Sequence, residues 1–322
     1  MAARKVNAAA GAQVLPYTRL VGQPQLKMAL ELSYIAPRIG GVLISGERGT
    51  AKSTAVRAFA LMVYGELPVT LPINATDDRV LGGWQIDDLL RGTAKKQPGL
   101  LEDAGKKGML YVDEVNLLDD HIVNIILDAS STGILTVQRE GLDQELRVEF
   151  SLVGTMNPEE GLLRPQLLDR FGLMVDVGVE TDVTARTEIL RAVLMLDEAV
   201  AHPTSEFLQH GRNEDQVLKQ RLDAARGRLY DVKVEDDVAS LCAEIAARFQ
   251  SAGHRGDIVM ALAARALAAR EEAEQVAPAH VVRVAQLALQ HRRHETNQRG
   301  PGYWTGEDDS TLQELVPPAD ER

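Results

Sequence analysis

The sequence contains one cysteine and no long apolar run. The single cysteine, Cys242, excludes an intrachain disulfide and a structural zinc site built on cysteines. Because it lies in the apolar run Leu241-Cys242-Ala243, we expect a buried, unreactive thiol. No stretch reaches the roughly 18 apolar residues that a membrane span needs, and the first residues lack the apolar segment of a signal peptide. We therefore expect a cytoplasmic protein without a membrane partner.

Basic residues and aromatic residues are also few. There are 35 lysines and arginines against 47 acidic residues, which gives a formal net charge of −12. Nucleic-acid binding depends on cations that contact phosphates, and no run of lysine and arginine stands out, so a nucleic-acid partner is disfavoured. Aromatic residues make up 4% of the chain, whereas alanine and leucine are abundant. This balance favours a helix-rich or α/β chain over an all-β one.

The order of apolar patterns predicts an α/β domain followed by a smaller helical domain. A chain of 322 residues is long enough for about two domains. The patterns divide it into a mobile tail at 1–16, an α/β core at 17–181, a helical domain at 182–295 and a disordered acidic tail at 296–322. Buried-type strands are expected at 41–45, 109–112, 150–155 and 175–179, and helices at 23–35, 52–64, 121–130, 183–201, 214–228, 235–249, 257–273 and 278–292. Residues 68–108 indicate short strands and turns.

A glycine-containing loop lies between the first strand and the helix that begins at Lys52. Its spacing is that of a phosphate-binding loop, except that Ala51 stands where glycine is usual. Such a loop directs backbone N–H groups at phosphates, and the following helix adds its positive end. Lys52 would supply a cation, and the Ser53 hydroxyl would bind Mg²⁺. The predicted ATP-binding residues are Gly46, Glu47, Arg48, Gly49, Thr50, Ala51, Lys52, Ser53 and Thr54.

Polar side chains follow two later strands. Asp113 and Glu114 end the strand at 109–112, and Asn157 follows the strand at 150–155. We expect Asp113 to hold Mg²⁺ through its water shell and Glu114 to polarise the attacking water as general base. Asn157 is a candidate to orient that water. The alternatives are that the two acids cap the next helix and that Asn157-Pro158 is a turn.

Three arginines are candidates for a catalytic role. Arg170 is a candidate arginine finger that a neighbouring subunit would supply, with Arg164 as its rival. The alternative for Arg170 is a surface salt bridge with Asp169. Arg255 opens a C-terminal helix and is a candidate to reach the nucleotide. The stretch 291–294, His-Arg-Arg-His, suggests a solvated helix end rather than a metal site, because its arginines are charged.

Taken in order, these motifs resemble the AAA+ ATPase subunit I of magnesium chelatase over roughly residues 14–295. The resemblance rests on 21–23, 46–53, 112–118, 154–158 and 163–171. It implies an AAA+ P-loop NTPase core with a parallel sheet, followed by an all-helical lid domain. It also implies that Val21 and Gly22 line the adenine pocket, that Asn157 is the first sensor, Arg170 the finger and Arg255 the second sensor. Insertions are expected at 79–107, which includes Trp84, and at the hairpin around Gly141.

The resemblance also implies partners. Members of the family form six-membered rings and drive a subunit with an integrin-like (VWA) domain, and through it a large catalytic subunit that inserts metal into a tetrapyrrole. Residues 63–68 lack the longer insertion, often with cysteines, of chlorophyll-pathway members. The metal, magnesium or cobalt, and the tetrapyrrole therefore stay open.

Four functions follow from these observations. The leading one is a ring ATPase that uses ATP and Mg²⁺ to drive a magnesium- or cobalt-chelatase-type complex. The second is a MoxR-like remodelling chaperone that acts on an integrin-like partner and no tetrapyrrole. The third is a nucleic-acid motor, which the acidic balance disfavours. The fourth is an inert nucleotide-binding scaffold, which the filled catalytic positions disfavour.

Overall fold

The computed structural model describes residues 14–84, 96–139, 142–202, 205–293 and 304–316. The chain forms two compact units, and each is described by itself. The first comprises Met1–Gly22, Gly46–Gly161 and Gly178–Gln216, and the second comprises Gln23–Ser45, Leu162–Val177 and Val217–Arg322. The units thus interleave along the chain, whereas the sequence divides it once, at residue 181. The expected tail at 1–16 lies largely outside the described residues.

Five short strands form the sheet, in the order β2-β5-β8-β1-β9. In the first unit, β2 (Val69–Leu71), β5 (Met109–Val112) and β8 (Ser151–Met156) pair in parallel. In the second, β1 (Val42–Ser45) pairs in parallel with β9 (Leu173–Asp176). Every residue of β1 and β5 is buried, which is why these strands are continuous apolar runs. The predicted α/β class with a parallel sheet is confirmed, although the last strand lies at 173–176 rather than 175–179.

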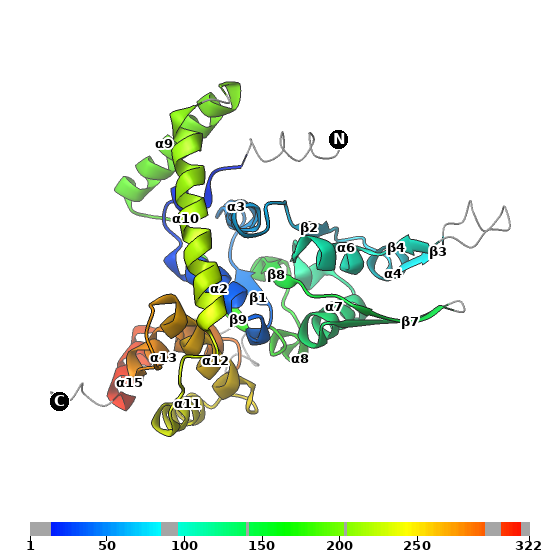
Figure 1. Cartoon of the computed structure of the whole chain (residues 1–322). Helices are drawn as coiled ribbons and strands as arrows, with labels where there is room; N and C mark the ends of the chain where they lie inside the picture. Colours follow the sequence, from blue (N-terminus) through cyan, green and yellow to red (C-terminus); the bar gives the residue numbers. More distant parts are fainter. Residues whose placement is uncertain (1–13, 85–95, 140–141, 203–204, 294–303, 317–322) are drawn as a thin grey trace. The chain divides into compact units, whose positions relative to one another are not determined.

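The first unit also contains helices and 3₁₀ turns, several of which are labelled in Figure 1. They are the 3₁₀ turns η1 (Tyr17–Arg19), η3 (Val115–Leu117) and η4 (Pro158–Glu160), and the α-helices α3 (Lys52–Tyr64), α4 (Asp77–Leu81), α6 (Leu100–Lys107), α7 (Asp120–Thr132), α9 (Val183–Ala201) and the start of α10 (Glu206–Arg228). Helices α4 and α6 fall in 68–108, where only strands and turns were predicted. Both are too short to show apolar periodicity in sequence.

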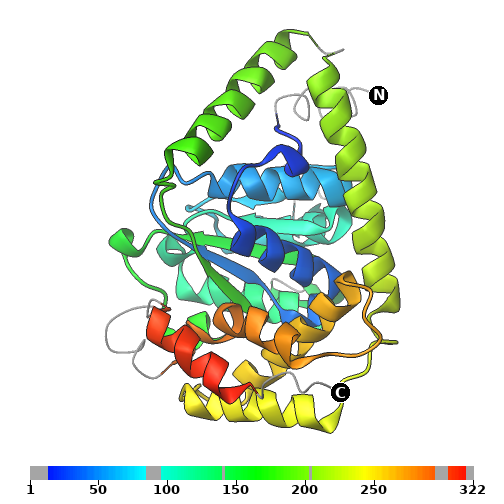
Figure 2. The ribbon, with the colours of Figure 1, turned by 90° about the vertical axis from the view of Figure 1, so that its left-hand side faces the viewer.

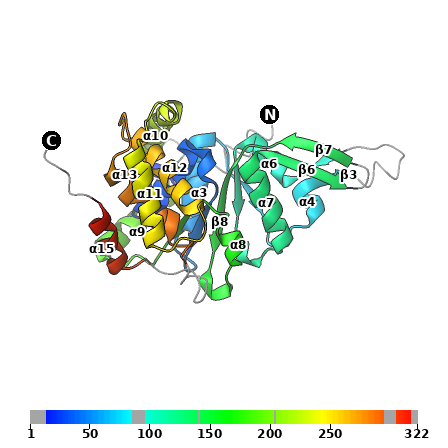
Figure 3. The ribbon, with the colours of Figure 1, turned by 90° about the horizontal axis from the view of Figure 1, so that it is seen from below.

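Two antiparallel hairpins belong to the first unit. One pairs β3 (Gly82–Trp84) with β4 (Lys96–Pro98), and the other pairs β6 (Ile134–Arg139) with β7 (Leu142–Arg147). Both extend from the same side of the unit (Figure 1 and Figure 3). They lie where the two insertions were expected, although Gly141 itself is outside the described residues.

Helix α9 has an unusually exposed apolar surface. It projects away from the strands (Figure 2), and Leu190, Val193 and Leu194 are each more than half exposed. Only Ala199 of this helix is buried. Within the described residues, none of the helices has the length and apolar character needed to cross a bilayer.

The second unit contains a helical core. Its elements are α2 (Pro24–Ile35), η2 (Pro37–Ile39), α8 (Pro165–Leu168), the end of α10, α11 (Asp236–Arg248), α12 (Arg255–Arg270), α13 (Pro278–Leu289) and α15 (Gly306–Leu315). Alanines of α12, among them Ala263, Ala264 and Ala268, are fully buried. Small side chains let α11, α12 and α13 approach closely, so this core is dense.

Helix α15 corrects the prediction of a disordered tail at 296–322. The helix begins with a capping box, in which Thr305 Oγ1 accepts from Asp308 N and the Asp308 carboxylate accepts from Thr305 N at 2.7 Å. Arg293 binds the same carboxylate, and Leu312 is 3% exposed. The helix could not be recognised from its polar composition. It is held by one buried apolar residue, Leu312, and by the ion pair between Arg293 and Asp308.

The stretch after α13 is also not the solvated helix end that the sequence suggested. His291 and Arg292 are each 2% exposed, and His294 lies outside the described residues. No group of three or more histidine, cysteine and acidic side chains in the described part of the chain is arranged to hold a metal. Arg292 is therefore a buried structural group, and Arg293, which is half-buried, pairs with Asp308.

Cys242 generates a first prediction. The thiol is buried and unpaired, and burial, together with the nearby Asp257 carboxylate, raises its pKa to about 11. Because the thiolate is the reactive form, we expect negligible reaction with a disulfide reagent such as DTNB at pH 8 in the folded protein and stoichiometric reaction in guanidinium. Rapid stoichiometric labelling of the folded chain would contradict the burial.

Candidate functional site

Hydrogen bonds close the loop between β1 and α3 and hold Lys52 against it. Gly46 N donates to Met156 O at 3.1 Å, and Thr50 Oγ1 closes the loop by donating to Glu47 O at 2.9 Å. Lys52 Nζ donates to the carbonyl oxygens of Gly46 and Glu47, at 2.5 and 2.7 Å. The ammonium therefore lies directly beside the loop backbone, at the N-terminus of α3.

Ala51, the residue that departs from the usual glycine, adopts a left-handed conformation. Its φ is 61° and its ψ is 20°, and it is the N-cap of α3. Glycine occupies this region freely, whereas an L-residue with a Cβ is strained there by about 1–2 kcal/mol. The backbone thus shows why glycine is usual at this position and why alanine, the smallest alternative, is tolerated.

The acidic pair lies at the tip of β5, beside the end of β8. The parallel register pairs Val112 with Gly154, so the residues that follow are neighbours. Asp113 Oδ1 accepts from Tyr111 Oη and from Thr155 Oγ1, both at 2.8 Å. Thr155 Oγ1 accepts in turn from Glu114 N at 3.1 Å. Burial raises the pKa of Tyr111 well above its ordinary value, so the phenol stays a donor at neutral pH.

Glu114 and Asn157 are held beside this cluster. Glu114 adopts φ 52° and ψ 57°, a strained conformation for a non-glycine residue that is typical of functional turns. Its carboxylate lies 3.4 Å from Arg48 Nη2, and the same guanidinium contacts Glu160. Asn157 is 4% exposed, and its Oδ1 accepts from Glu159 N at 3.3 Å.

These groups line one pocket of about 440 Å³, a size suited to a small-molecule ligand. The lining residues are Arg48, Gly49, Thr50, Ala51, Lys52, Ser53, Thr54, Tyr111, Asp113, Glu114, Thr155, Met156 and Asn157. The structure thus gathers Arg48 to Thr54 of the predicted phosphate loop, the acidic pair and Asn157 in one pocket, whereas Gly46 and Glu47 are not among its lining residues. Tyr111 and Thr155 had no predicted role, since their contribution depends on the strand register.

The donor set in this pocket fits Mg²⁺. The Ser53 hydroxyl and the Asp113 carboxylate both face the pocket, and both supply oxygen. Mg²⁺ is commonly held by one or two carboxylates together with substrate phosphates and water. Carboxylate and hydroxyl oxygens beside a phosphate loop therefore match this ion better than they would match zinc, which prefers nitrogen and sulfur.

Val21 and Gly22 do not line this pocket. The turn before them is fixed to α10, because the Asp215 carboxylate accepts from the backbone N–H groups of Tyr17 and Thr18 at 3.0 and 2.8 Å. Tyr17 also packs edge-on against Phe59 of α3, with ring centroids 5.2 Å apart. The turn at Tyr17 and Thr18 therefore packs against α3, the helix that follows the phosphate loop.

The three candidate arginines belong to the second unit and are absent from the pocket lining. Arg164 is exposed at the N-cap of α8, and Arg170 is half-buried after it. Arg255 donates to Asp169 O at 3.3 Å and lies 3.6 Å from its carboxylate. Asp169, the proposed surface partner of Arg170, is thus engaged by Arg255 and also by Arg292, at 3.1 Å.

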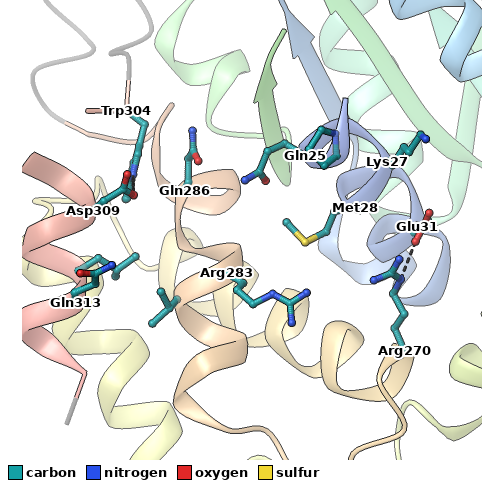
Figure 4. Close-up of a pocket in the computed structure, with 13 residues that line it drawn as sticks. Gln25, Lys27, Met28, Glu31, Arg270, Arg283, Gln286, Trp304, Asp309 and Gln313 are labelled. Carbon is teal, nitrogen blue, oxygen red and sulfur yellow. Dashed lines mark hydrogen bonds and ion pairs between the residues drawn. The ribbon is translucent and has the colours of Figure 1, made fainter. Parts of the chain in front are cut away.

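A second pocket, of about 590 Å³, lies within the second unit (Figure 4). Side chains of α2, α12, α13 and α15 line it, and Glu31 pairs with Arg270 at one edge of it, at 2.7 Å. Its lining contains no phosphate-binding loop and no acidic strand tip. Although it is larger, it lacks the chemistry of the first pocket.

Ala51 generates a stability prediction. Ala51→Gly should raise the free energy of unfolding by about 0.5–1 kcal/mol, because it removes the left-handed strain. Ala51→Val should lower it, since a β-branched side chain is more strained there. The matched control is Ala58→Gly within α3, which should destabilise by about 1 kcal/mol or more. Urea titration measures all three, and a destabilised Ala51→Gly would oppose the assignment.

Thr155 generates a second stability prediction. Thr155→Val removes the hydroxyl that binds Asp113 and Glu114 N while keeping the side-chain shape. We expect a loss of about 1–3 kcal/mol in the free energy of unfolding, because two polar groups lose a partner. Thr155→Ser keeps the hydroxyl and should cost clearly less. Equal losses for the two variants would show that the methyl group, not the hydrogen bonds, carries the effect.

Comparisons with known proteins agree with this geometry. Residues 41–171 match the family model of the AAA domain (dynein-related subfamily), and residues 239–315 match that of the AAA lid domain. A putative ATPase from Cytophaga hutchinsonii has a similar fold, with a TM-score of 0.66 and 18% identity over 98% of this chain and 94% of that one. That likeness concerns the fold alone.

Curated relatives extend the likeness to sequence. The magnesium-chelatase 38 kDa subunit of Cereibacter sphaeroides is 41% identical over 86% of this chain and 91% of its own length. Magnesium-chelatase subunit ChlI of Cyanophora paradoxa is 37% identical over 87% and 90%. An uncharacterised protein of Mycobacterium tuberculosis is 42% identical over 86% of this chain, which spans only 44% of that protein. With its AAA domain, its lid and its nearly full-length relatives, this chain belongs to the magnesium-chelatase subunit I family of AAA+ proteins.

Proposed function

We propose that this chain hydrolyses ATP in an oligomeric ring and so drives a metal-chelatase-type complex. The observation that carries the proposal is the single pocket that contains the phosphate loop, Ser53, the acidic pair and Asn157. Family membership supports it, since the curated relatives are named as subunits of magnesium chelatase. ATP hydrolysis is the reaction that this chain itself would perform.

Binding would use the residues from Gly46 to Thr54. Backbone N–H groups and the N-terminus of α3 attract the β- and γ-phosphates. Lys52 Nζ, which bonds two loop carbonyls, would exchange them for phosphate oxygens, a stronger partner for a cation. Ser53 and Asp113 would hold Mg²⁺, which neutralises phosphate charge when bound. Val21 and Gly22 would contact adenine.

Hydrolysis would depend on Glu114 and Asn157. Glu114 is the proposed base that polarises the attacking water, and Asn157 the proposed sensor that orients it. The backbone of Glu114 is fixed by Thr155, and its carboxylate by Arg48. An electrostatic contact to an exposed guanidinium is weak, so the carboxylate can exchange Arg48 for water and substrate.

The finger and the second sensor would act between subunits. Arg170 would stabilise charge on the γ-phosphate of a neighbouring protomer, with Arg164 as its rival, and Arg255 would report the nucleotide state. This arrangement makes hydrolysis depend on assembly, which we propose is a six-membered ring. The proposed setting is cytoplasmic, without nucleic acid or membrane.

The proposed partners are a subunit with an integrin-like (VWA) domain and a large catalytic chelatase subunit that inserts magnesium or cobalt. A MoxR-like chaperone that remodels a VWA partner without a tetrapyrrole is the second candidate. One observation favours it: α3 ends at Tyr64 and β2 begins at Val69, which leaves no room for a longer insertion. Affinity purification from the native host separates the two, because only the first predicts a large chelatase subunit among the captured proteins.

Glu114→Gln tests the base. The variant keeps the size of the side chain and loses its basicity, so we expect ATP binding to persist and turnover to fall at least ~100-fold. Fluorescent-nucleotide titration and phosphate release measure the two quantities. The control is Glu159→Gln, an exposed neighbour that should change neither. Normal turnover by Glu114→Gln would refute the assigned base.

Arg170→Ala tests the finger. We expect nucleotide affinity close to that of the unmodified chain and a loss of roughly 10³-fold in hydrolysis. Mixing Arg170→Ala with Glu114→Gln should restore turnover, because the Glu114→Gln subunit supplies an intact Arg170 to the neighbouring Arg170→Ala site. Arg164→Ala is the matched control. No restoration on mixing with Glu114→Gln, or a larger loss for Arg164→Ala, would reject Arg170 as a finger that acts in trans.

A further inference from the structure

Three consecutive buried residues follow α13 and bind the segment that carries Arg170. Gln290, His291 and Arg292 are each 2% exposed. Their side chains bond backbone carbonyl groups between Asp169 and Met174, more than a hundred residues earlier in the chain. We call these three residues the latch. Polar side chains at such burial require partners, and here one short segment supplies most of them.

Arg292 makes most of the contacts. Its Nη2 donates to Asp169 O at 2.9 Å and to Phe171 O at 2.5 Å, and its Nη1 donates to Gly172 O at 2.9 Å. Its Nε donates to the Asp169 carboxylate at 3.1 Å. Nη1 also donates to Ala288 O, within its own helix. The guanidinium therefore binds the backbone on both sides of Arg170.

Gln290 and His291 complete the latch. Gln290 Nε2 donates to Met174 O. His291 Nε2 lies 3.1 Å from Phe171 O, and since a carbonyl only accepts, this nitrogen carries the proton. Burial, together with the Arg292 charge, lowers the pKa of His291 well below its ordinary value. The ring is therefore neutral at physiological pH and does not switch there.

Other contacts also restrict the backbone of residues 169–174, the segment that the latch binds. Phe171 is 1% exposed. A Cβ at Gly172 would meet Ile39 O at 2.1 Å, so the backbone there already touches η2. Arg255 adds a further contact to Asp169. Because the carbonyls that flank Arg170 are held by one rigid guanidinium, the backbone of Arg170 must follow the end of α13.

A buried cation is a costly way to stabilise a fold. Removing a guanidinium from water costs several kcal/mol, and apolar residues often stabilise a core as well. The planar guanidinium of Arg292, with its five N–H donors, instead fixes the geometry of the groups that it binds. Lysine could not reproduce it, because one ammonium cannot span the acceptors from Asp169 to Gly172.

We propose that Arg292 is a positioning residue for Arg170, and that the latch makes the end of α13 and the Arg170 segment a single mechanical piece. This rests on the proposed role of Arg170 as a finger in trans. Arg292 has no contact with nucleotide in this scheme. It sets the direction from which Arg170 reaches the neighbouring protomer, and so connects the lid helices of one subunit to hydrolysis in the next.

The test compares Arg292→Lys with Arg293→Lys in the full chain. Arg293 is the adjacent arginine and pairs with Asp308 of α15 instead. We expect Arg292→Lys to lower ATP turnover at least tenfold while its affinity for fluorescent ATP changes less than twofold. Arg293→Lys should keep turnover within twofold of the unmodified chain. Gln290→Met, which loses the bond to Met174 O, should lower turnover about two- to fivefold and serves if Arg292→Lys fails to fold.

Mixed oligomers separate positioning from general damage. Arg292→Lys keeps its own phosphate loop and Glu114, whereas Glu114→Gln keeps Arg170. Mixing these two inactive chains should restore turnover, because a Glu114→Gln subunit supplies a correctly held Arg170 to an Arg292→Lys site. Gln290→Met mixed with Glu114→Gln should show the same restoration. A chain with general damage would not be restored.

The outcomes distinguish the two proposals. Normal turnover by Arg292→Lys, or restoration with Glu114→Gln for Arg170→Ala but not for the latch variants, overturns the latch and leaves the finger intact. If Arg170→Ala itself is fully active, the finger proposal fails and the latch proposal fails with it. Restoration of both Arg170→Ala and Arg292→Lys supports both.

Discussion

The site depends on the parallel register of β5 and β8, which sets Asp113 beside Thr155. One threonine hydroxyl binds the carboxylate of Asp113 and the backbone N–H of Glu114, so it positions both acids at once. A shift of the register would separate these groups and turn alternate side chains to the opposite face. The phosphate loop supplies the opposite wall of the same pocket. The pocket is thus a consequence of strand pairing as much as of motif.

The second unit uses polar side chains in a related way. There a buried guanidinium, rather than a hydroxyl, binds several carbonyl groups of one segment. In both units a single side chain fixes the backbone around a candidate catalytic residue. Hydrogen bonds to backbone groups suit this purpose because they define direction, whereas apolar packing mainly defines distance.

Family membership and the pocket both support the proposed ATPase, but family membership concerns the complex and the pocket concerns individual residues. The relatives show what kind of complex such chains belong to. The pocket contains the residues that we propose bind a triphosphate and Mg²⁺. The exposed apolar residues of α9 and the short α3–β2 connection are features of this particular chain, and its partners must be compatible with both.

Local features could be predicted from the sequence: the strand–loop–helix around Lys52, the acids after β5, the hairpin of β6 and β7, and the longer helices of the second half. Each depends on neighbouring residues, whose periodicity and spacing are visible in a single chain. It missed α4 and α6, the capped helix α15 and the roles of Thr155 and Tyr111, and it misjudged His291 and Arg292 as solvated. Those features depend on partners distant in sequence: Asp113 for Thr155, Asp308 for Arg293, and Asp169 to Gly172 for Arg292. These features could be assigned only from the three-dimensional structure, because the free energy of burying a polar group depends on the hydrogen-bond acceptors that the fold places near it.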